Sequence, residues 1–543
     1  MNQSFSRRFT RRIFLGTAAA ALTAAAALTA ASAWAEPPTT SLRPVERDAD
    51  LYKQAIPNVS EIIADSGITG TVAFAVVDVD TGIWLEASNA TDGIPPASSI
   101  KAITALYALD QLGPDHVFET RLLATGGVVD GEVQGDLILV GGGDPTLDSD
   151  NLGQMAEDLK EAGIIGVKGA FKVYEGALPA TFAIDPEQPD HVGYNPGVSG
   201  IALNYNRVHF EWKRSGDGYD VTMEGRAARY APAVRVATME VVDRSGPVYT
   251  YENRPERDVW TVAKGALGSG GARWLPIRRP GVYAGDIFAT IARSHGIKLG
   301  DAELIETLPE GETLVTHRST KLRPILKDML KYSTNLTAEM VGMAASAKRL
   351  GTVPSPRASA AEMNKWAIEE LGMENPAMID HSGLGDDSKM TVHDMAGGLA
   401  RIHGTGLRPI LKPVYLRDDR GRPERDNPIE IDAKTGTLNF VSALAGFLTT
   451  PEDRVLAFAI LTANIEERAK ISRAERERPP GARAWNARAK RVQRGLLERW
   501  GLLYNVAVKP EPEGEAAPKT PAAPDPDAEA EVGAEPEVAL EES

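Results

Sequence analysis

Residues 95–101 read Pro95-Pro96-Ala97-Ser98-Ser99-Ile100-Lys101, and the segment that they open runs to Gly113-Pro114. Between these two breaks the side chains are apolar on almost every side, which predicts a buried helix. Ser98 and Lys101 are three residues apart, so their side chains share one face of this helix, with about 5–6 Å between the Cβ atoms. No other Ser-x-x-Lys occurs in the chain.

The spacing of Ser98 and Lys101 suits a nucleophile and its base. A serine hydroxyl becomes reactive when a neighbouring base takes its proton. Lys101 can be that base only as a neutral amine, so its pKa must fall by roughly three pH units from about 10.4. Burial and a second cation nearby both lower a lysine pKa. At the helix start, where Ser98 lies, a backbone N–H can point at a developing oxyanion. Alone, however, the motif is more often a chance pair on a surface helix.

A second element, Lys434-Thr435-Gly436-Thr437, is expected at the end of a strand over residues 429–433. A strand edge beside a serine can supply a backbone N–H and can align a peptide substrate by adding it to the sheet. Lys434 would add positive charge for a substrate carboxylate, and Gly436 would let the backbone approach closely. The alternative for this element alone is a turn at a strand end with a solvated lysine.

Ser-x-Asn occurs twice, as Ser333-Thr334-Asn335 and as Ser149-Asp150-Asn151. A hydroxyl close to Lys101 could relay a proton to a leaving amine, and the amide could hold a substrate backbone. Ser149 lies in an Asp-rich stretch, which predicts a turn. Ser333 lies between two helical patterns, so its loop could face the helix that starts at Ser98. The sequence therefore favours Ser333 over Ser149.

The apolar pattern predicts an α/β domain into which a β-rich part is inserted. Alternation over residues 71–80 predicts a strand that turns back as a hairpin, and helical periodicity dominates residues 322–371. Short β-like runs among Gly- and Pro-rich turns fill residues 119–306. Strands and a basic amphipathic helix are predicted late in the chain, over residues 429–433, 440–448, 455–462 and 485–504. The expected domains are residues 36–120 with 305–506, and the insertion 121–304.

The two ends of the chain are not expected to join the fold. Residues 1–35 carry arginine pairs, an Ala-rich apolar run and Ala33-Trp34-Ala35, which is typical of a secretory signal and resembles the twin-arginine type. Residues 507–543 are rich in Pro, Ala and Glu and contain no aromatic residue, which predicts a disordered acidic tail.

Composition excludes several classes of function. The 543 residues include no cysteine, which removes disulfides, thiolate catalysis and cysteine-based zinc sites. The eight histidines form no His-Glu-x-x-His, so neither a metal nor another cofactor is expected. The formal net charge is −16 without a basic stripe, which argues against a nucleic-acid partner. The basic closing helix could still rest on a membrane surface.

In their order along the chain, Ser-x-x-Lys, Ser-x-Asn and Lys-Thr-Gly are the signature of penicillin-binding proteins and class A β-lactamases. From about Leu51 to Tyr504 the chain resembles a narrower group, the D-Ala-D-Ala carboxypeptidase/endopeptidases of the penicillin-binding protein 4 family. That family's insertion would explain the long gap between Ser98 and Ser333. The resemblance rests on residues 96–101, 135–147, 333–339, 380–384 and 434–438.

The resemblance implies a fold and a set of partners. The fold is α/β and β-lactamase/transpeptidase-like: an antiparallel sheet with flanking helices and a helical subdomain, carrying a large inserted mostly-β domain. The implied substrates are peptidoglycan peptides that end in D-Ala-D-Ala, cleaved as a carboxypeptidase or as an endopeptidase. The implied inhibitors are β-lactams, and the implied location is the periplasm.

The resemblance also implies a role for each residue of the site. Ser98 would attack the carbonyl of the penultimate D-Ala, with Lys101 as base, and Ser333 would pass a proton to the leaving D-Ala. The substrate contacts would come from the amide of Asn335, from Lys434, Thr435 and Gly436 of the strand, and from an oxyanion hole made by the N–H groups of Ser98 and Thr437.

Two residues depart from the family pattern. His381 stands where a glycine is usual, and Glu175 is the nearest candidate for the acidic residue that the family's inserted domain often places near the cleft. Two other functions fit part of the evidence. A β-lactamase would share Ser98 and Lys101 but would deacylate quickly, and a non-catalytic wall-binding protein would carry the three motifs as a relic.

Overall fold

A computed structural model describes residues 56–254, 257–418 and 420–505 of the chain. The predicted signal over residues 1–35 and the predicted tail over residues 507–543 lie outside the described residues. Within the described part, no helix combines the length and the apolar character that crossing a membrane would need.

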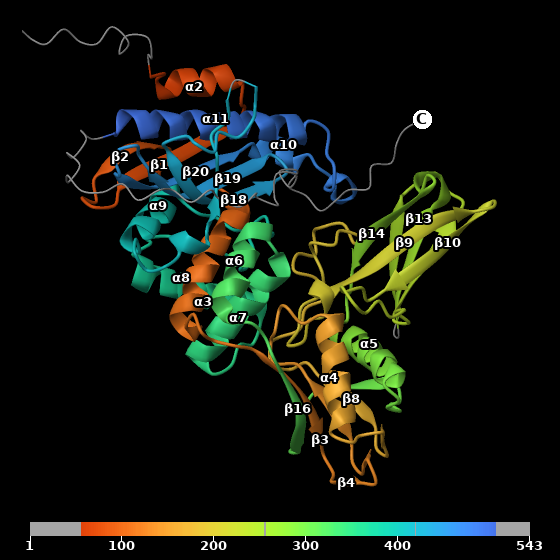
Figure 1. Cartoon of the computed structure of the whole chain (residues 1–543). Helices are drawn as coiled ribbons and strands as arrows, with labels where there is room; N and C mark the ends of the chain where they lie inside the picture. Colours follow the sequence, from red (N-terminus) through yellow and green to blue (C-terminus); the bar gives the residue numbers. More distant parts are fainter. Residues whose placement is uncertain (1–55, 255–256, 419, 506–543) are drawn as a thin grey trace, which may run out of the picture. The chain divides into compact units, whose positions relative to one another are not determined.

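A six-stranded antiparallel sheet joins the beginning and the end of the described chain (Figure 1). The first strand pairs with a strand near the C-terminus along its whole length, from Thr71 opposite Ala463 to Asp78 opposite Leu456. In order across the sheet, the strands are β17 (Lys412–Pro413), β18 (Glu430–Leu438), β19 (Val441–Thr449), β20 (Val455–Ala463), β1 (Thr71–Asp78) and β2 (Trp84–Ser88).

Helices cover both faces of this sheet, which is why the apolar residues of β1 run almost without a break. Successive side chains of a strand point to opposite faces, and a sheet covered on both sides buries all of them. On one face lie α11 (Ala482–Leu503) and, packed beside it, α2 (Val59–Ser66) (Figure 1). The residues of β1 on the α11 face are Val72, Phe74 and Val76, and those on the other face are Ala73, Ala75 and Val77.

The other face carries a layer of helices with α3 at its centre. Every residue of α3 from Lys101 to Ala108 is buried, as the apolar pattern predicts. A short 3-10 turn, η2 (Ala97–Ile100), leads into α3 and begins with a positive φ of 48° at Ala97. Around α3 and against the sheet lie α6 (Leu322–Tyr332), α7 (Asn335–Leu350), α8 (Pro356–Leu371) and α9 (Val392–Arg401).

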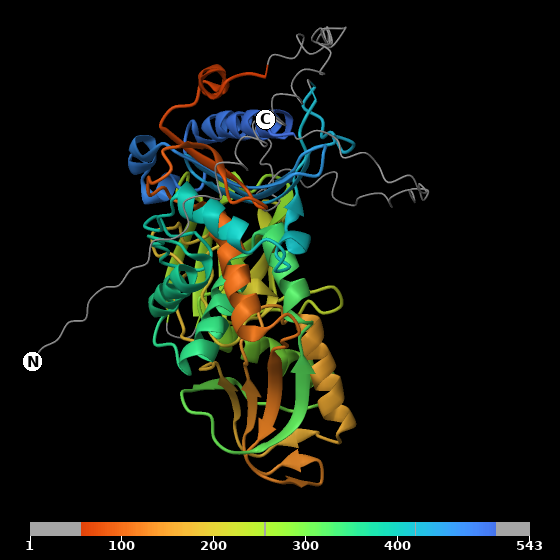
Figure 2. The same ribbon diagram turned by 90° about the vertical axis from the view of Figure 1, so that its left-hand side faces the viewer.

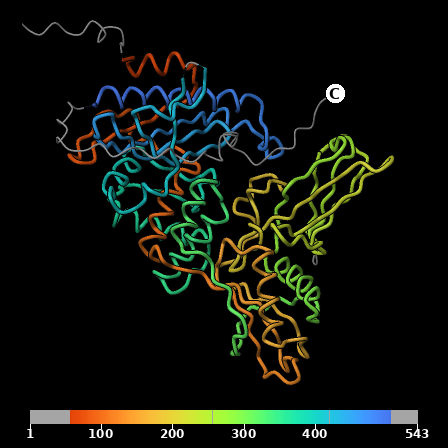
Figure 3. The backbone as a smooth tube through the Cα atoms, in the orientation of Figure 1, coloured from red at the N-terminus to blue at the C-terminus, as the bar shows by residue number. Residues whose placement is uncertain are grey.

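Between α3 and α6 the chain leaves this body and returns, which the smooth trace makes easy to follow (Figure 3). The outgoing strand β3 and the returning strand β16 pair antiparallel with each other, side by side in Figure 2. They belong to a five-stranded sheet in the order β15 (Ala302–Ile305), β8 (Phe171–Tyr174), β6 (Leu137–Val140), β3 (Glu119–Ala124) and β16 (Glu312–Arg318).

The rest of this excursion is mostly β. Two helices, α4 (Ser149–Glu161) and α5 (Pro280–Ser294), share its core with the five-stranded sheet. Its three-stranded sheets, in spatial order, are β10 (Gly218–Glu224), β9 (Arg207–Ser215) and β14 (Gly270–Pro276); β11 (Ala237–Val242), β13 (Arg257–Ala263) and β12 (Tyr249–Arg254); and β4 (Val128–Val129), β5 (Glu132–Val133) and β7 (Gly166–Val167).

The predicted fold class is confirmed: an antiparallel sheet flanked by helices carries a large inserted part that is mostly β. The domain boundaries at 120/121 and 304/305 stay predictions. In the structure, the first strand of the inserted part, β3, begins at Glu119, and its last strand, β16, ends at Arg318.

Candidate active site

Ser98 and Lys101 lie together at the start of α3. The Nζ atom of Lys101 is 2.8 Å from the Oγ atom of Ser98. The same amine donates to the Oδ1 atom of Asn335 at 2.7 Å and to the carbonyl oxygen of Ser382 at 2.7 Å. Lys101 has no exposed surface, whereas Ser98 is partly exposed. A buried amine therefore holds a hydroxyl that solvent or a substrate can reach.

Burial lowers the pKa of Lys101 from 10.5 to about 7, and the carboxyl groups of Asp380 and Glu339 act in the opposite direction. Burial raises the pKa of both acids, that of Glu339 to about 8. Burial rather than a second cation is thus the main cause of the lowered pKa of Lys101. Burial also lowers the pKa of Lys434, and the nearby charge of Lys101 lowers it further.

Ser333 occupies the break between α6 and α7. Its φ of 59° is left-handed, and it ends α6 while Thr334 begins the next helix. The helical pattern over residues 322–371 therefore contains a sharp corner at Ser333. At this corner the Oγ atom of Ser333 accepts a hydrogen bond of 2.9 Å from the Nζ atom of Lys434.

Lys434 lies within a strand, so the predicted end of that strand at Ala433 is wrong. β18 continues to Leu438, because residues Lys434 to Leu438 pair with β19 up to Val441. Lys434 is 2% exposed, which excludes a solvated lysine. Along β18 the buried residues Lys434 and Gly436 alternate with the exposed residues Thr435 and Thr437.

The outer edge of β18 is open beside the Ser98 turn. The short strand β17 pairs only with Ala433 and Asp432, so beyond Ala433 no strand of the described chain covers this edge. Glycine at position 436 is required by the close packing. A Cβ atom there would lie 2.9 Å from the oxygen of Pro96 and 3.0 Å from the nitrogen of Ser98.

Asn335 connects the site to the inserted part. Its Oδ1 atom accepts the hydrogen bond from Lys101, and its Nδ2 atom donates to the carbonyl oxygen of Tyr194 at 3.0 Å. The residues predicted for the site thus come together from three distant segments of the chain. Tyr194, Glu339, Asp380 and Ser382 join them, although the sequence analysis gave them no role.

Ser149 lies elsewhere, inside the inserted part, and the turn predicted for it is wrong. It is the first residue of α4, where Asp148 caps the helix by accepting a hydrogen bond from the nitrogen of Asn151. Its hydroxyl is buried and donates to the carbonyl oxygen of Gly225 at 2.8 Å. The Asp-rich stretch that indicates a turn is also a strong helix start.

Glu175 also has a structural contact. Its Oε2 atom accepts a hydrogen bond of 2.9 Å from the nitrogen of Gly281, in the first turn of α5. A carboxylate stabilises a helix at this end, where the N–H groups have no partner within the helix. The inserted part reaches the site through the backbone of Tyr194 instead.

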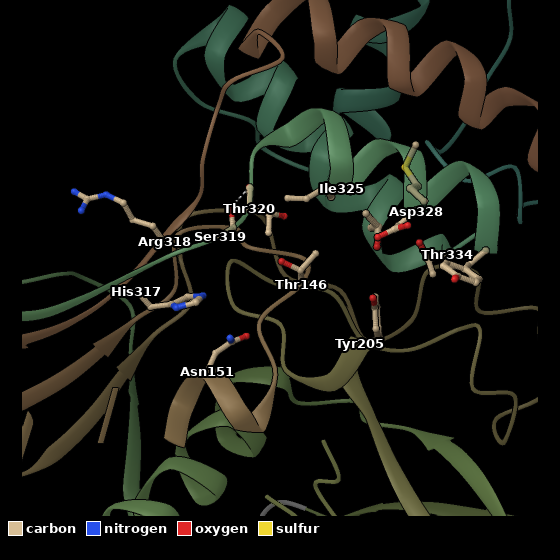
Figure 4. A pocket seen from close by; sticks show the side chains of 13 residues that line it. Thr146, Asn151, Tyr205, His317, Arg318, Ser319, Thr320, Ile325, Asp328 and Thr334 are labelled. Carbon is tan, nitrogen blue, oxygen red and sulfur yellow. Dashed lines mark hydrogen bonds between the residues drawn. The ribbon is translucent and has the colours of Figure 1, made fainter. Parts of the chain in front are cut away.

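A cavity of about 450 Å³ opens beside the Ser333 corner (Figure 4). Tyr205 and His317 line it from the inserted part, and Asp328 and Thr334 line it from α6 and the start of α7. None of the predicted site residues lines this cavity. The groups around Lys101 are therefore distinct from it.

The sequence model of the D-Ala-D-Ala carboxypeptidase 3 (S13) family matches residues 55–412 and 418–478. The chain belongs to this family. The family is one of D-Ala-D-Ala carboxypeptidases, so the predictions of family and of enzyme class are confirmed, and the protein is a serine-type hydrolase of D-Ala-D-Ala peptides.

Relatives and a solved structure agree with membership of the S13 family. A D-alanyl-D-alanine carboxypeptidase of Actinomadura sp. (strain R39) is 28% identical over 439 residues, which is 74% of this chain and 80% of the relative. D-alanyl-D-alanine carboxypeptidase DacB of Haemophilus influenzae is 21% identical over 437 residues, 74% of this chain and 87% of the relative.

The fold matches the crystal structure of penicillin binding protein 4 (dacB) from Haemophilus influenzae with a TM-score of 0.65 and 20% identity, covering 80% of this chain and 98% of that chain. A second structure of that protein, complexed with a β-lactam, matches with a TM-score of 0.61. These likenesses support the transpeptidase-like fold with its insertion.

The burial of Lys101 should lower the free energy of unfolding by an amount that is larger at pH 7 than at higher pH. The unfolded chain holds Lys101 with a pKa of 10.5 and the folded protein with a pKa of about 7. Unfolding therefore takes up a proton between these values, and the free energy of unfolding rises by about 1.4 kcal/mol per pH unit there. The neutral variant Lys101→Met lacks this dependence. Relative to the unchanged protein, its stability should be greatest at pH 7 and should fall towards pH 9.5.

Calorimetric unfolding temperatures at several pH values between 7 and 9.5 measure this difference. Lys160→Met, which removes an exposed lysine of α4, is the matched control and should differ from the unchanged protein by a constant amount. A constant difference for Lys101→Met as well would mean that the folded and unfolded chains hold this proton equally tightly.

Proposed function

We propose that this protein removes the terminal D-Ala from peptidoglycan stem peptides through an acyl-enzyme on Ser98. The single observation that carries the proposal is the contact between Ser98 and a fully buried lysine. The Nζ atom of Lys101 lies 2.8 Å from the hydroxyl, within the reach that proton transfer needs. Burial lowers the pKa of this amine to about 7, so a large fraction is neutral at neutral pH.

The first half of the reaction forms the acyl-enzyme. Lys101 takes the hydroxyl proton while the Oγ atom of Ser98 bonds to the carbonyl carbon of the penultimate D-Ala. The resulting oxyanion faces the backbone N–H groups of Ser98 and Thr437, which can stabilise it without rearranging. When the intermediate collapses, the peptide C–N bond breaks and the leaving D-Ala takes a proton through Ser333. Water then hydrolyses the ester and restores Ser98.

The open edge of β18 supports a peptide that binds as an added strand. Beyond Ala433 this edge carries backbone groups and the exposed side chains of Thr435 and Thr437. Peptides commonly bind sheet edges in this way. The amide of Asn335 lies next to Lys101 and could hold the peptide backbone on the other side.

Lys434 is suited to meet the terminal carboxylate. Burial, together with the nearby cations Lys101 and Lys412, holds its pKa well below 10.5. An arriving carboxylate favours the charged ammonium, so binding would draw a proton onto Lys434. The contact of this amine with the hydroxyl of Ser333 links carboxylate recognition to the group that protonates the leaving amine.

β-Lactams are the expected inhibitors, since the related penicillin binding protein 4 of Haemophilus influenzae is known in complex with one. A substrate in the cell wall also requires export, which residues 1–35 would provide. The proposed location is therefore the periplasm.

Penicillin should form one lasting adduct, on Ser98. Mass spectrometry of the intact protein should show a single addition, and peptide mapping should place it within residues 96–101. Ser98→Ala should form no adduct, whereas Ser60→Ala, which changes an exposed serine of α2, should react as the unchanged protein does. Rapid release of the adduct with hydrolysed penicillin would favour the β-lactamase alternative instead.

The rate of acylation should depend on pH through Lys101. Protonated Lys101 cannot accept a proton, and its pKa is about 7. Below that value the rate should therefore fall by about tenfold per pH unit. Penicillin acylation in stopped flow between pH 5 and 9 measures this, with circular dichroism at each pH as a check on folding. A rate that stays constant down to pH 5 would contradict Lys101 as the base.

Product analysis tests the substrate. Incubation with a stem pentapeptide should release one equivalent of free D-Ala and leave the tetrapeptide, and Ser98→Ala should release none. Cross-linked muropeptides, incubated in parallel, test for endopeptidase activity through the appearance of monomers. Cleavage of the cross-links without release of D-Ala from the pentapeptide would contradict the carboxypeptidase assignment. No product from either substrate would favour a wall-binding protein.

A further inference from the structure

The loop over residues 380–384 closes the site behind Lys101. The carbonyl oxygen of Ser382 accepts a hydrogen bond from the amine of Lys101, and that of His381 accepts one of 2.7 Å from the Oγ1 atom of Thr104. Thr104 lies one turn after Lys101 on α3. The same helix thus holds two successive carbonyl groups of this loop, one of which orients the amine.

The side chain of His381 anchors this loop from behind. The imidazole has no exposed surface, and its Nε2 atom is 2.7 Å from the Oγ atom of Ser359 on α8. Ser359 contacts the hydroxyl of Ser346 on α7 at 2.7 Å, and Ser346 contacts the hydroxyl of Tyr107 on α3 at 3.0 Å. A continuous row of hydrogen bonds therefore connects His381 to three helices.

The imidazole is neutral in this setting, because burial lowers the pKa of His381 to about 3. A neutral ring has one N–H donor. The Nε2 atom shares a hydrogen bond with the Oγ atom of Ser359, and the Nδ1 atom lies 3.2 Å from the sulfur of Met363. The ring therefore has a polar contact at each nitrogen, although no solvent reaches it.

The neighbouring helix leaves room for the ring. A Cβ atom at Gly342 of α7 would lie 2.2 Å from the Cγ atom of His381, far inside contact distance. The ring also lies parallel to that of Tyr107, with 6.5 Å between the ring centres. The space at Gly342 and the hydrogen bond to Ser359 both favour the observed position of this side chain.

We propose that His381 is a positioning residue for the base: its buried hydrogen bond to Ser359 fixes the 380–384 loop, so that the carbonyl oxygen of Ser382 holds the amine of Lys101 against Ser98. The proposal rests on the proposed roles of Ser98 and Lys101. It assigns a purpose to a histidine at a position where glycine is usual in the family.

Removing the ring should change both the rate and its pH dependence. A loosened loop would let the Ser382 carbonyl and the Lys101 amine move, and misplacement by about 1 Å can slow a reaction on the order of 100-fold. Water entering the space would relieve the burial of Lys101, so its pKa would rise towards the ordinary value. The other charged groups that face Lys101 are Asp380 in this loop, Glu339 on α7 and Lys434 on β18. Asp380 would move with the loop, but burial is the largest cause of the lowered pKa of Lys101, so the relief of burial should outweigh any weaker interaction with Asp380.

The test compares His381→Ala, His381→Gln and Ser359→Ala by penicillin acylation between pH 5 and 10. For His381→Ala we expect a rate about 10- to 100-fold lower at pH 7 and a midpoint about one pH unit higher. With a D-Ala-D-Ala peptide, kcat should fall more than KM changes. Gln retains a group at the end of the side chain that can donate or accept a hydrogen bond, so His381→Gln should recover part of the loss. Ser359→Ala should shift the midpoint in the same direction as His381→Ala.

A substitution at Gly342 distinguishes the effect of lost packing from the effect of the lost hydrogen bond. The double variant His381→Ala with Gly342→Ala refills part of the space without restoring the hydrogen bond to Ser359, so it should recover thermal stability but not the pH midpoint. A folded His381→Ala protein with an unchanged rate and pH midpoint would overturn the proposal. If it does not fold, an unchanged midpoint in Ser359→Ala would overturn it equally. A failure of the proposed function differs visibly, because the unchanged protein would then form no adduct on Ser98.

Discussion

The structure around this site depends on one constraint, the removal of the Lys101 amine from water. Burying an ammonium group is costly, and an amine in that environment gives up its proton more readily. The burial of α3 from Lys101 to Ala108 creates the environment, with helices on its sides and the sheet at its start. Three hydrogen bonds, to Ser98, Asn335 and Ser382, then satisfy the amine where water cannot.

Those partners are distant in sequence, and the packing of α3 against α7 brings Asn335 to Lys101. The pairing of β1 with β20 joins the two ends of the described chain in one sheet, and the large insertion leaves the body at one place. The chain departs after α3 and returns before α6, where the nitrogen of Leu322 donates to the oxygen of His116 at 2.8 Å. Because exit and return are tied together, the insertion leaves the contact of α3 with α6 and α7 intact.

Much of the fold and of the site could be predicted from the sequence, because motifs and periodicity are local signals. The Ser98–Lys101 spacing, the strands on either side and the inserted β-rich part all follow from short patterns. The strand that contains Lys434 is longer than its pattern suggests, since its partner β19 extends it. Ser149 looked like part of a turn because the same Asp-rich residues serve turns and helix starts.

The surroundings of Lys101 were harder to predict for a physical reason. Glu339 and Asp380 act through space, and the carbonyl groups of Ser382 and Tyr194 are backbone atoms that any residue could supply. A carboxylic acid in an apolar helical run, as at Glu339, is the one signal that could have pointed to this environment. The bulk of His381 likewise fits because Gly342, far away in sequence, leaves space for it.

The two buried acids matter because burial alone could lower the pKa of Lys101 too far. A lysine whose pKa fell far below neutrality would be free of its proton but too weak to take one from a serine hydroxyl. Asp380 and Glu339 raise the pKa of Lys101 against the effect of burial, and the balance lies at about 7. The same acids stabilise the ammonium that forms when Ser98 loses its proton. An amine between an apolar helix and two acids can therefore be neutral before the reaction begins. It can also carry the proton of Ser98 as an ammonium group while the reaction proceeds.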